Sequence, residues 1–163
     1  MDGVVVERDD ENGWKPESIG ELAVMVVDDD SLITRLVAGA LKAIGITKLY
    51  TMNDPRQAMD FVAEGLGGID LILCDLMMPE IDGLTILKRV RETKKKLPFL
   101  MLTADSTSDS VKQAAELGVT GYMIKPFTID DLQDKVRQTI SRSYGSKAAE
   151  RALPGAEHQT RWS

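Results

Sequence analysis

The sequence has few of the residues that build disulfide frameworks, membrane spans or nucleic-acid surfaces. Its 163 residues include one cysteine, Cys74, which excludes an intramolecular disulfide. No apolar run approaches the length of about 18 residues that spans a membrane, and the acidic N-terminus lacks the basic start and apolar core of a signal peptide. The formal charge of −6 argues against binding to nucleic acid or to an anionic membrane. We therefore expect a cytoplasmic protein with neither kind of partner.

The composition is that of one folded domain with short extensions. The hydrophobic fraction is 43% and the charged fraction 28%, both ordinary for a globular protein. Residues 1–20 are polar and acidic, which predicts a flexible N-terminal extension, with a short edge strand at 4–6 as the less favoured alternative. We place the domain at 21–142. Residues 143–163 form a C-terminal extension, expected to be helical through 147–153 and disordered after Pro154.

Short apolar runs alternate with helical patterns along the domain. Five runs read as strands, and they lie at 23–27, 48–52, 69–74, 99–102 and 121–124. After the first run, Ile33, Val37 and Ile44 belong to a series of apolar residues three and four apart, and similar patterns follow the other runs. Five strands that alternate with five helices indicate an α/β fold with a parallel sheet.

Acidic and basic residues follow several of these runs directly. Asp28 and Asp29 follow the first run, Asp75 the third and Lys125 the fifth, while Thr103 follows the fourth. The carboxyl ends of parallel strands meet at one edge of a sheet, so these side chains should converge there. Clustered carboxylates favour a hard cation such as Mg²⁺, and a lysine beside them can pair with a phosphoryl group. The pattern predicts a phosphoryl-accepting acidic pocket.

Four motifs in this order resemble one known family. They are Val26–Ser31, Cys74–Pro79, Leu102–Ala104 and Tyr122–Phe127, and together they resemble the receiver domain of two-component response regulators, in its stand-alone CheY-like type. The resemblance covers about 22–141. It implies a doubly wound five-stranded parallel sheet of the flavodoxin or CheY-like (βα)5 kind, with strand order 2-1-3-4-5.

The resemblance also implies a role for each acidic residue. Asp75 would be the phosphoacceptor, whose carboxylate attacks a phosphohistidine to give an acyl phosphate. Asp29 and Asp75 would bind Mg²⁺ directly, Asp28 would act mainly through water, and the backbone carbonyl of Met77 would complete the protein's share of the ligands. Asp30 is expected to be a solvated charge with no part in the chemistry.

The remaining motif residues would contact the phosphoryl group or respond to its presence. Lys125 would pair with a phosphoryl oxygen, and the peptide bond to Pro126 would be cis. Thr103 would donate its hydroxyl, while Ala104 leaves space for the group. Tyr122 would then rotate inward and change the face formed by the fourth helix, fifth strand and fifth helix. The alternative for Tyr122 is a static, half-buried strand residue.

The implied partners are a histidine kinase or histidine phosphotransfer protein upstream, and a target protein at that helical face downstream. Whether the chain acts in chemotaxis or passes the phosphoryl group on in a relay stays open. The phosphate lifetime also stays open: the Met77 thioether cannot orient an attacking water, whereas Asp105 could either orient it or repel hydroxide, and these two effects oppose each other. A Mg²⁺-dependent aspartyl-phosphate phosphatase is the alternative from another class. It would need a second acid or base, yet the only histidine is His158 in the tail. A flavin site fails because the acidic run 28–30 repels a flavin phosphate.

Overall fold

The computed structural model describes residues 14–94, 96–105 and 107–151. Its centre is one parallel sheet of five strands in the order β2-β1-β3-β4-β5. The strands are β1 (Ala23–Val27), β2 (Lys48–Met52), β3 (Leu71–Asp75), β4 (Phe99–Thr103) and β5 (Gly121–Ile124). This order confirms the predicted doubly wound topology, in which all strands are parallel and the order of strand addition reverses between β1 and β3.

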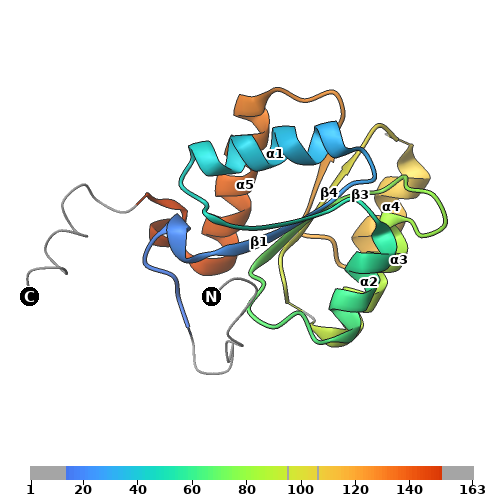
Figure 1. Cartoon of the computed structure of the whole chain (residues 1–163), viewed down its shortest axis with the longest axis horizontal. Coiled ribbons are helices and arrows are strands. Elements are labelled where there is room, and N and C mark those ends of the chain that lie inside the picture. Colours follow the sequence, from blue (N-terminus) through green and yellow to red (C-terminus); the bar gives the residue numbers. More distant parts are fainter. Residues whose placement is uncertain (1–13, 95, 106, 152–163) are drawn as a thin grey trace, which may run out of the picture.

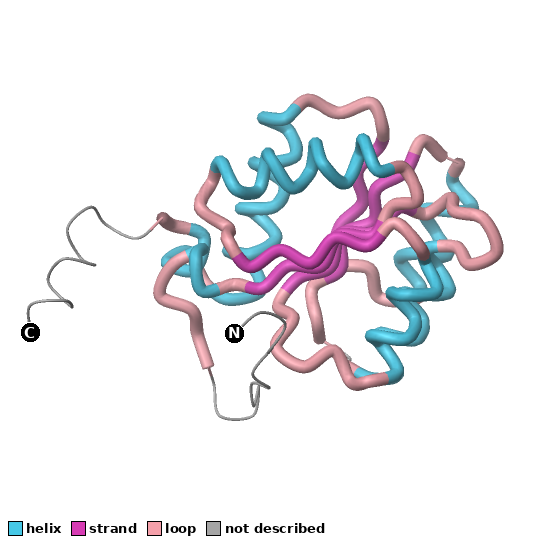
Figure 2. The backbone as a smooth tube through the Cα atoms, viewed as in Figure 1, coloured by secondary structure: helices cyan, strands magenta, loops and turns pink. Residues whose placement is uncertain are grey.

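Helices cover both faces of the sheet (Figures 1 and 2). One face carries α1 (Ser31–Ala43) and α5 (Ile129–Tyr144), and the other carries α2 (Pro55–Ala63), α3 (Gly83–Thr93) and α4 (Ser108–Glu116). Two short 3-10 helices, η2 (Ile19–Glu21) and η3 (Ser146–Ala149), lie at the two ends of the described chain. The result is a three-layer α/β domain.

The three central strands are apolar on both faces because helices bury both. Along β1, Val24 and Val26 enter the core under α1 and α5, while Ala23, Met25 and Val27 enter the core on the opposite side. Every residue of β1, β3 and β4 is buried. The predicted strand positions hold to within two residues, the largest difference being the start of β3 at Leu71 rather than residue 69.

A polar side chain caps the start of each α-helix. The N-cap residues are Asp30, Asp54, Asp82, Thr107 and Thr128, and each accepts a hydrogen bond from a backbone N–H of the first turn. Asp30 thereby acquires a structural role, since its carboxylate holds the Leu32 N–H at 2.9 Å. These caps fix the loops that leave the carboxyl ends of the strands.

The two ends of the described chain pack against each other and against the domain. The ring of Trp14 lies edge-on to that of Tyr144, with centroids 6.0 Å apart. Ile19 is fully buried, and its N–H donates to the carbonyl of Glu150 at 2.8 Å. Ile19 therefore does not behave as part of the flexible extension predicted for residues 1–20, of which 1–13 lie outside the described residues. Ile19 belongs to a core cluster that draws on distant segments, including Ala148 of η3, which local composition does not show.

The C-terminal extension also differs in part from expectation. After α5, Gly145 adopts a positive φ of 97° that ends the helix, and the described residues continue as the short η3 rather than as a helix over 147–153. Residues 152–163, with His158 and the tail expected to be disordered, lie outside the described range.

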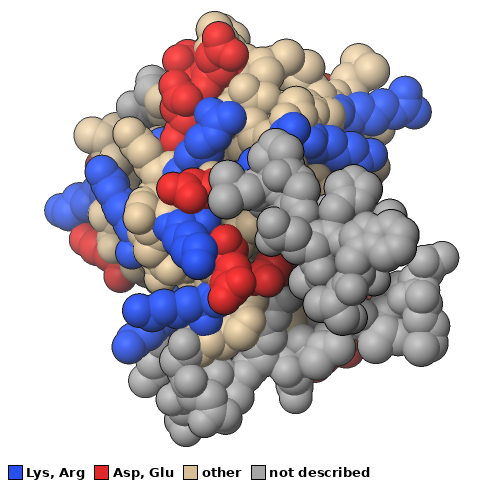
Figure 3. All heavy atoms as spheres, turned by 90° about the vertical axis from the view of Figure 1, so that its left-hand side faces the viewer, with Lys and Arg blue, Asp and Glu red and all other residues tan. Residues whose placement is uncertain are grey.

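On the face that Figure 3 shows, the visible Lys and Arg side chains are interspersed with those of Asp and Glu. The described part of this face thus carries no extended patch of one charge. Among the described helices, none is both long enough and apolar enough to span a membrane.

Candidate functional site

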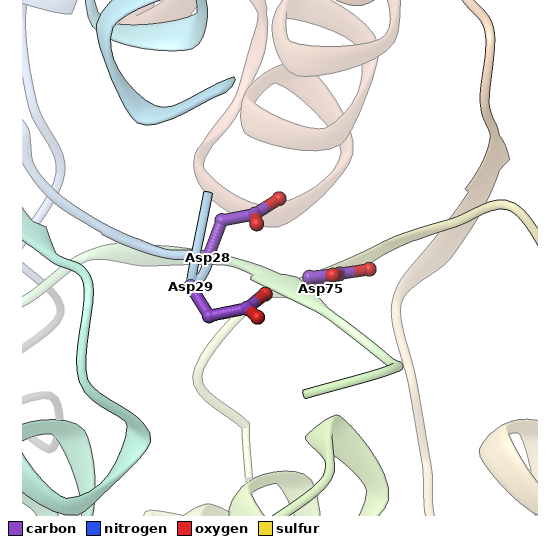
Figure 4. Close-up of side chains that lie close together, drawn as sticks. All are labelled: Asp28, Asp29 and Asp75. Atoms are coloured by element: carbon purple, nitrogen blue, oxygen red, sulfur yellow. The ribbon is translucent and has the colours of Figure 1, made fainter. Parts of the chain in front are cut away.

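Three carboxylates gather at the carboxyl edge of the sheet, as the sequence predicted. Asp28 and Asp29 follow β1, and Asp75 is the last residue of β3 (Figure 4). One oxygen from each carboxylate lies within 4.8 Å of the others. Asp28 and Asp75 are buried, whereas Asp29 is exposed, so the cluster opens to solvent on one side.

The backbone around Asp75 is closely packed. Gly83, the first residue of α3, donates its N–H to the Leu76 carbonyl at 2.8 Å. A Cβ atom at Gly83 would come within 2.4 Å of the Asp75 carbonyl oxygen and 2.9 Å of Leu76 Cα. Only glycine allows this approach, which holds the end of β3 against the start of α3.

Lys125 brings the positive charge to the cluster from the end of β5. Its ammonium group donates to Asp28 at 2.8 Å and lies 3.5 Å from Asp75. Burial alone would lower the pKa of Lys125, but the hydrogen bond and charge of Asp28, together with the charge of Asp75, outweigh it and raise that pKa. The peptide bond from Lys125 to Pro126 is cis.

Asp75 is the carboxylate whose ionisation the site perturbs most clearly. Burial, followed by the charge of Asp28, raises the pKa of Asp75 to about 6, although Lys125 and the Met77 N–H act in the opposite direction. When Asp75 is ionised at neutral pH, the acidic cluster therefore carries an excess of negative charge. Binding a cation, or converting Asp75 to another group, would relieve that repulsion.

Thr103 and Tyr122 meet at the loop between β4 and α4. The Thr103 hydroxyl oxygen accepts the Asp105 N–H at 3.0 Å, and the Tyr122 hydroxyl donates to the Asp105 carbonyl at 2.7 Å. Tyr122 is half-buried, and burial followed by the charge of Asp105 raises the pKa of its phenol. The two predicted switch residues thus hold the same loop residue, Thr103 through the N–H of Asp105 and Tyr122 through its carbonyl.

The two residues expected to set the phosphate lifetime line the same groove, of about 570 Å³, but make different contacts. The Met77 side chain is exposed. The Asp105 carboxylate accepts the Ser110 hydroxyl at 2.7 Å and the Thr107 N–H at 2.9 Å, which lower its pKa. Asp105 is therefore engaged by the first turn of α4.

The donor set suits a hard divalent cation. Mg²⁺ prefers oxygen ligands, is bound through one or two carboxylates and keeps several waters. Among the described residues, three carboxylates face a single ammonium group here, and the exposed side of Asp29 leaves room for water. The residues present therefore fit Mg²⁺, with Asp29 and Asp75 as the carboxylates that would hold it.

Sequence reasoning missed one residue that contacts this cluster. Asn53 directly precedes Asp54, the N-cap of α2, and the sequence pattern gave it no role at the site. Its side-chain amide instead donates to the Asp28 carbonyl at 2.9 Å and to the Thr34 hydroxyl at 3.0 Å. Its place directly after β2, the strand beside β1, was the available signal.

Comparison with known proteins agrees with the family resemblance of the four sequence motifs. A family model described as the response regulator receiver domain matches residues 24–137. Among curated proteins, the chemotaxis protein CheY of Pseudomonas aeruginosa is 33% identical over 126 residues, which cover 76% of this chain and 100% of the relative. The chemotaxis protein CheY-3 of Vibrio cholerae is 32% identical over 123 residues, which cover 74% of this chain and 93% of the relative.

Solved structures give the same result. The chemotaxis response regulator CheY4 of Vibrio cholerae superposes with a TM-score of 0.65 at 28% identity, over 72% of this chain and 98% of the other. A response regulator receiver domain protein from Clostridium thermocellum gives a TM-score of 0.68 at 25% identity, over 74% and 95%. The family match over residues 24–137 includes the positions of Asp28, Asp29 and Asp75.

Proposed function

The chain belongs to the response regulator receiver domain family, and from this we propose that Asp75 accepts a phosphoryl group from a phosphohistidine on a histidine kinase or phosphotransfer protein. A carboxylate oxygen of Asp75 attacks the phosphorus as the phosphorus–nitrogen bond breaks. The electron pair stays on the imidazole nitrogen, and an acyl phosphate forms on Asp75. The observation that carries the proposal is the buried Asp75 carboxylate with Lys125 at 3.5 Å.

The other residues of the cluster would hold the reacting groups in place. Asp29 and Asp75 would bind Mg²⁺ with the Met77 carbonyl, and Asp28 would act through water while it orients Lys125 by the 2.8 Å hydrogen bond. Bound Mg²⁺ would supply charge neutralisation for phosphoryl transfer. Lys125 would pair with a phosphoryl oxygen, so the chain would assist its own phosphorylation and dephosphorylation while serving as a signalling switch.

The direct test is to incubate the protein with a Mg²⁺ salt and a small phosphodonor. We expect one labile phosphoryl adduct, which peptide mapping by mass spectrometry assigns to Asp75 because its carboxylate lies beside both Lys125 and the cation ligands. Asp75→Asn should give no adduct, and Asp30→Asn, which keeps a good N-cap residue, should give the normal amount. Normal uptake by Asp75→Asn would overturn the assignment.

Mg²⁺ should raise the melting temperature of the wild-type protein because it binds the folded acidic cluster. Differential scanning calorimetry at increasing Mg²⁺ would measure the shift. Asp29→Asn removes one expected ligand, so most of the increase should vanish, although Asp29 is exposed and contributes little to the core. A full Mg²⁺ response in Asp29→Asn would show that the cation binds elsewhere.

Output would pass through the loop after β4. An acyl phosphate offers the Thr103 hydroxyl a strong acceptor, which competes with the Asp105 N–H that it now accepts at 3.0 Å. Movement of Asp105 would also alter the hydrogen bond from Tyr122 and hence the face of α4, β5 and α5. On that face the large apolar side chains of Val111 and Ile124 are exposed, which suits a protein partner.

Thr103→Ala should therefore separate uptake from output. The acceptor carboxylate is unchanged, so the variant should still form the adduct, but its target binding should respond much less to phosphorylation. A pull-down that compares beryllofluoride-treated wild type, Thr103→Ala and Asp75→Asn measures this difference. Equal partner capture by treated wild type and Thr103→Ala would remove Thr103 from the switch. Passing the phosphoryl group on in a relay, and a cytoplasmic location, stay predictions.

A further inference from the structure

We propose that Asn53 is a positioning residue for the acidic cluster, acting through the backbone of Asp28. Its side-chain amide would hold the turn between β1 and α1 so that Asp29 presents its carboxylate to a cation. The inference rests on the proposed Mg²⁺ site, and it concerns a residue outside the motifs that identified that site. The premise is the pair of hydrogen bonds from Asn53 Nδ2.

The two hydrogen bonds tie three parts of the chain together. Asn53 Nδ2 donates to the Asp28 carbonyl at 2.9 Å and to Thr34 Oγ1 at 3.0 Å, so both of its hydrogens have acceptors. Thr34, in the first turn of α1, is buried and donates its own hydroxyl to the Ser31 carbonyl at 3.0 Å. The hydroxyl thus has a fixed direction and can hold the Asn53 amide.

Asn53 extends the sheet by one residue at the point where the site begins. The regular pairing of β1 with β2 ends at Val27 and Met52, and the Asp28 N–H still reaches the Met52 carbonyl at 3.1 Å. The Asp28 carbonyl has no further strand residue to pair with, and the Asn53 amide takes that place. Both backbone groups of Asp28 are therefore held by the end of β2.

This matters most for Asp29. Within the described residues, no hydrogen bond or ion pair joins the Asp29 side chain to the protein. Its position in the cluster thus depends on the direction of the Asp28–Asp29 peptide, which contains the carbonyl that Asn53 holds. The Asp28 carboxylate, in contrast, is fixed directly by the Asp30 N–H and by Lys125.

The test is Mg²⁺ affinity, measured by isothermal titration calorimetry at a temperature where every variant is folded. Asn53→Ala should weaken binding about tenfold, the usual effect of losing a group that orients a metal ligand. Asn53 is exposed, so the substitution leaves no cavity in the core. In the metal-free protein, the backbone amide signal of Asp29 should also shift, a change that general destabilisation would not produce.

Thr34 provides a matched set of variants. Thr34→Val should weaken Mg²⁺ binding, Thr34→Ser should restore it, and the double variant with Asn53→Ala should bind no worse than Asn53→Ala alone. Thr139→Val is the control, since Thr139 is equally buried and donates to the Lys135 carbonyl within α5, on which the acidic cluster does not depend. It should lose stability without loss of Mg²⁺ affinity.

The outcomes separate this inference from the proposed function. Wild-type Mg²⁺ affinity in Asn53→Ala, with or without lower thermal stability, would overturn the positioning role and leave the metal site standing. If Thr139→Val weakened Mg²⁺ binding as much as Asn53→Ala does, the loss of affinity would come from general destabilisation. That result would also overturn the positioning role of Asn53. A wild-type protein that binds no Mg²⁺ would overturn both the metal site and this inference.

Discussion

Asp75→Asn is expected to stabilise the metal-free protein by about 2 to 3 kcal/mol at neutral pH. The pKa of Asp75 is raised to about 6 from the ordinary value of 3.8, mainly by burial and then by Asp28. Each unit of difference between the folded and unfolded pKa corresponds to about 1.4 kcal/mol. Asparagine carries no charge, so the variant avoids this cost, although it gives up the contact with Lys125 at 3.5 Å.

The direction of the pH dependence follows from the raised pKa. Below about pH 4 the carboxyl of Asp75 is protonated in both states and costs nothing. As the pH rises from about 4 to 6, the unfolded chain releases this proton more readily than the folded one, so the wild type loses stability relative to the variant. The difference should reach its full size about one unit above the folded pKa of about 6, near pH 7, and stay constant from there.

Urea denaturation in EDTA between pH 4 and 8 would measure this difference. Asp60→Asn is a suitable control because Asp60 lies exposed on α2, and its effect should stay within about 0.5 kcal/mol at every pH. Adding Mg²⁺ should reduce the difference in unfolding free energy between Asp75→Asn and the wild type, since the cation stabilises the wild type more than the variant. A less stable Asp75→Asn at pH 7 would mean that the Lys125 contact outweighs burial.

Much of the fold could be predicted because its signals are local. The central strands are buried on both faces, and this makes them continuous apolar runs such as Ala23–Val27 that are readable without any partner. The caps are likewise local, since Asp54 and Thr128 bond to N–H groups two and three residues away. The site followed from topology, because parallel strands deliver their last residues to one edge.

What the sequence did not indicate depends on contacts between distant segments. Asn53 bonds to Asp28 across 25 residues, and Ile19 bonds to Glu150 across the whole domain. The partner of Lys125 is another case, because its shortest contact is with Asp28 rather than with the expected phosphoacceptor Asp75. The sequence spacing predicts that Lys125, Asp28 and Asp75 lie at the same edge of the sheet. Which carboxylate oxygen the ammonium group contacts depends on side-chain packing.

Lys125→Ala should be among the most destabilising substitutions at this end of the sheet when metal is absent. The ammonium group contacts Asp28 and Asp75, whose side chains are only 3% and 8% exposed. Its removal leaves two buried carboxylates beside Asp29 without a cation. Breaking a buried ion pair typically costs about 3 to 5 kcal/mol. We expect about 2 to 3 kcal/mol here, since the Lys125 side chain is 20% exposed and water can reach the cluster from that side.

The loss of stability in Lys125→Ala should depend on the negative charge that remains in the cluster. This dependence distinguishes a charge effect from a loss of packing. In the Asp75→Asn background the same substitution removes the cation from one carboxylate fewer, so Lys125→Ala should cost clearly less than in the wild type. Mg²⁺ should recover part of the stability of the single variant, because it neutralises the same carboxylates. Lys88→Ala, an exposed lysine on α3 outside the described ion pairs, should show neither effect. Equal costs of Lys125→Ala in both backgrounds would instead show that the aliphatic stem of Lys125, and not its charge, stabilises this edge of the sheet.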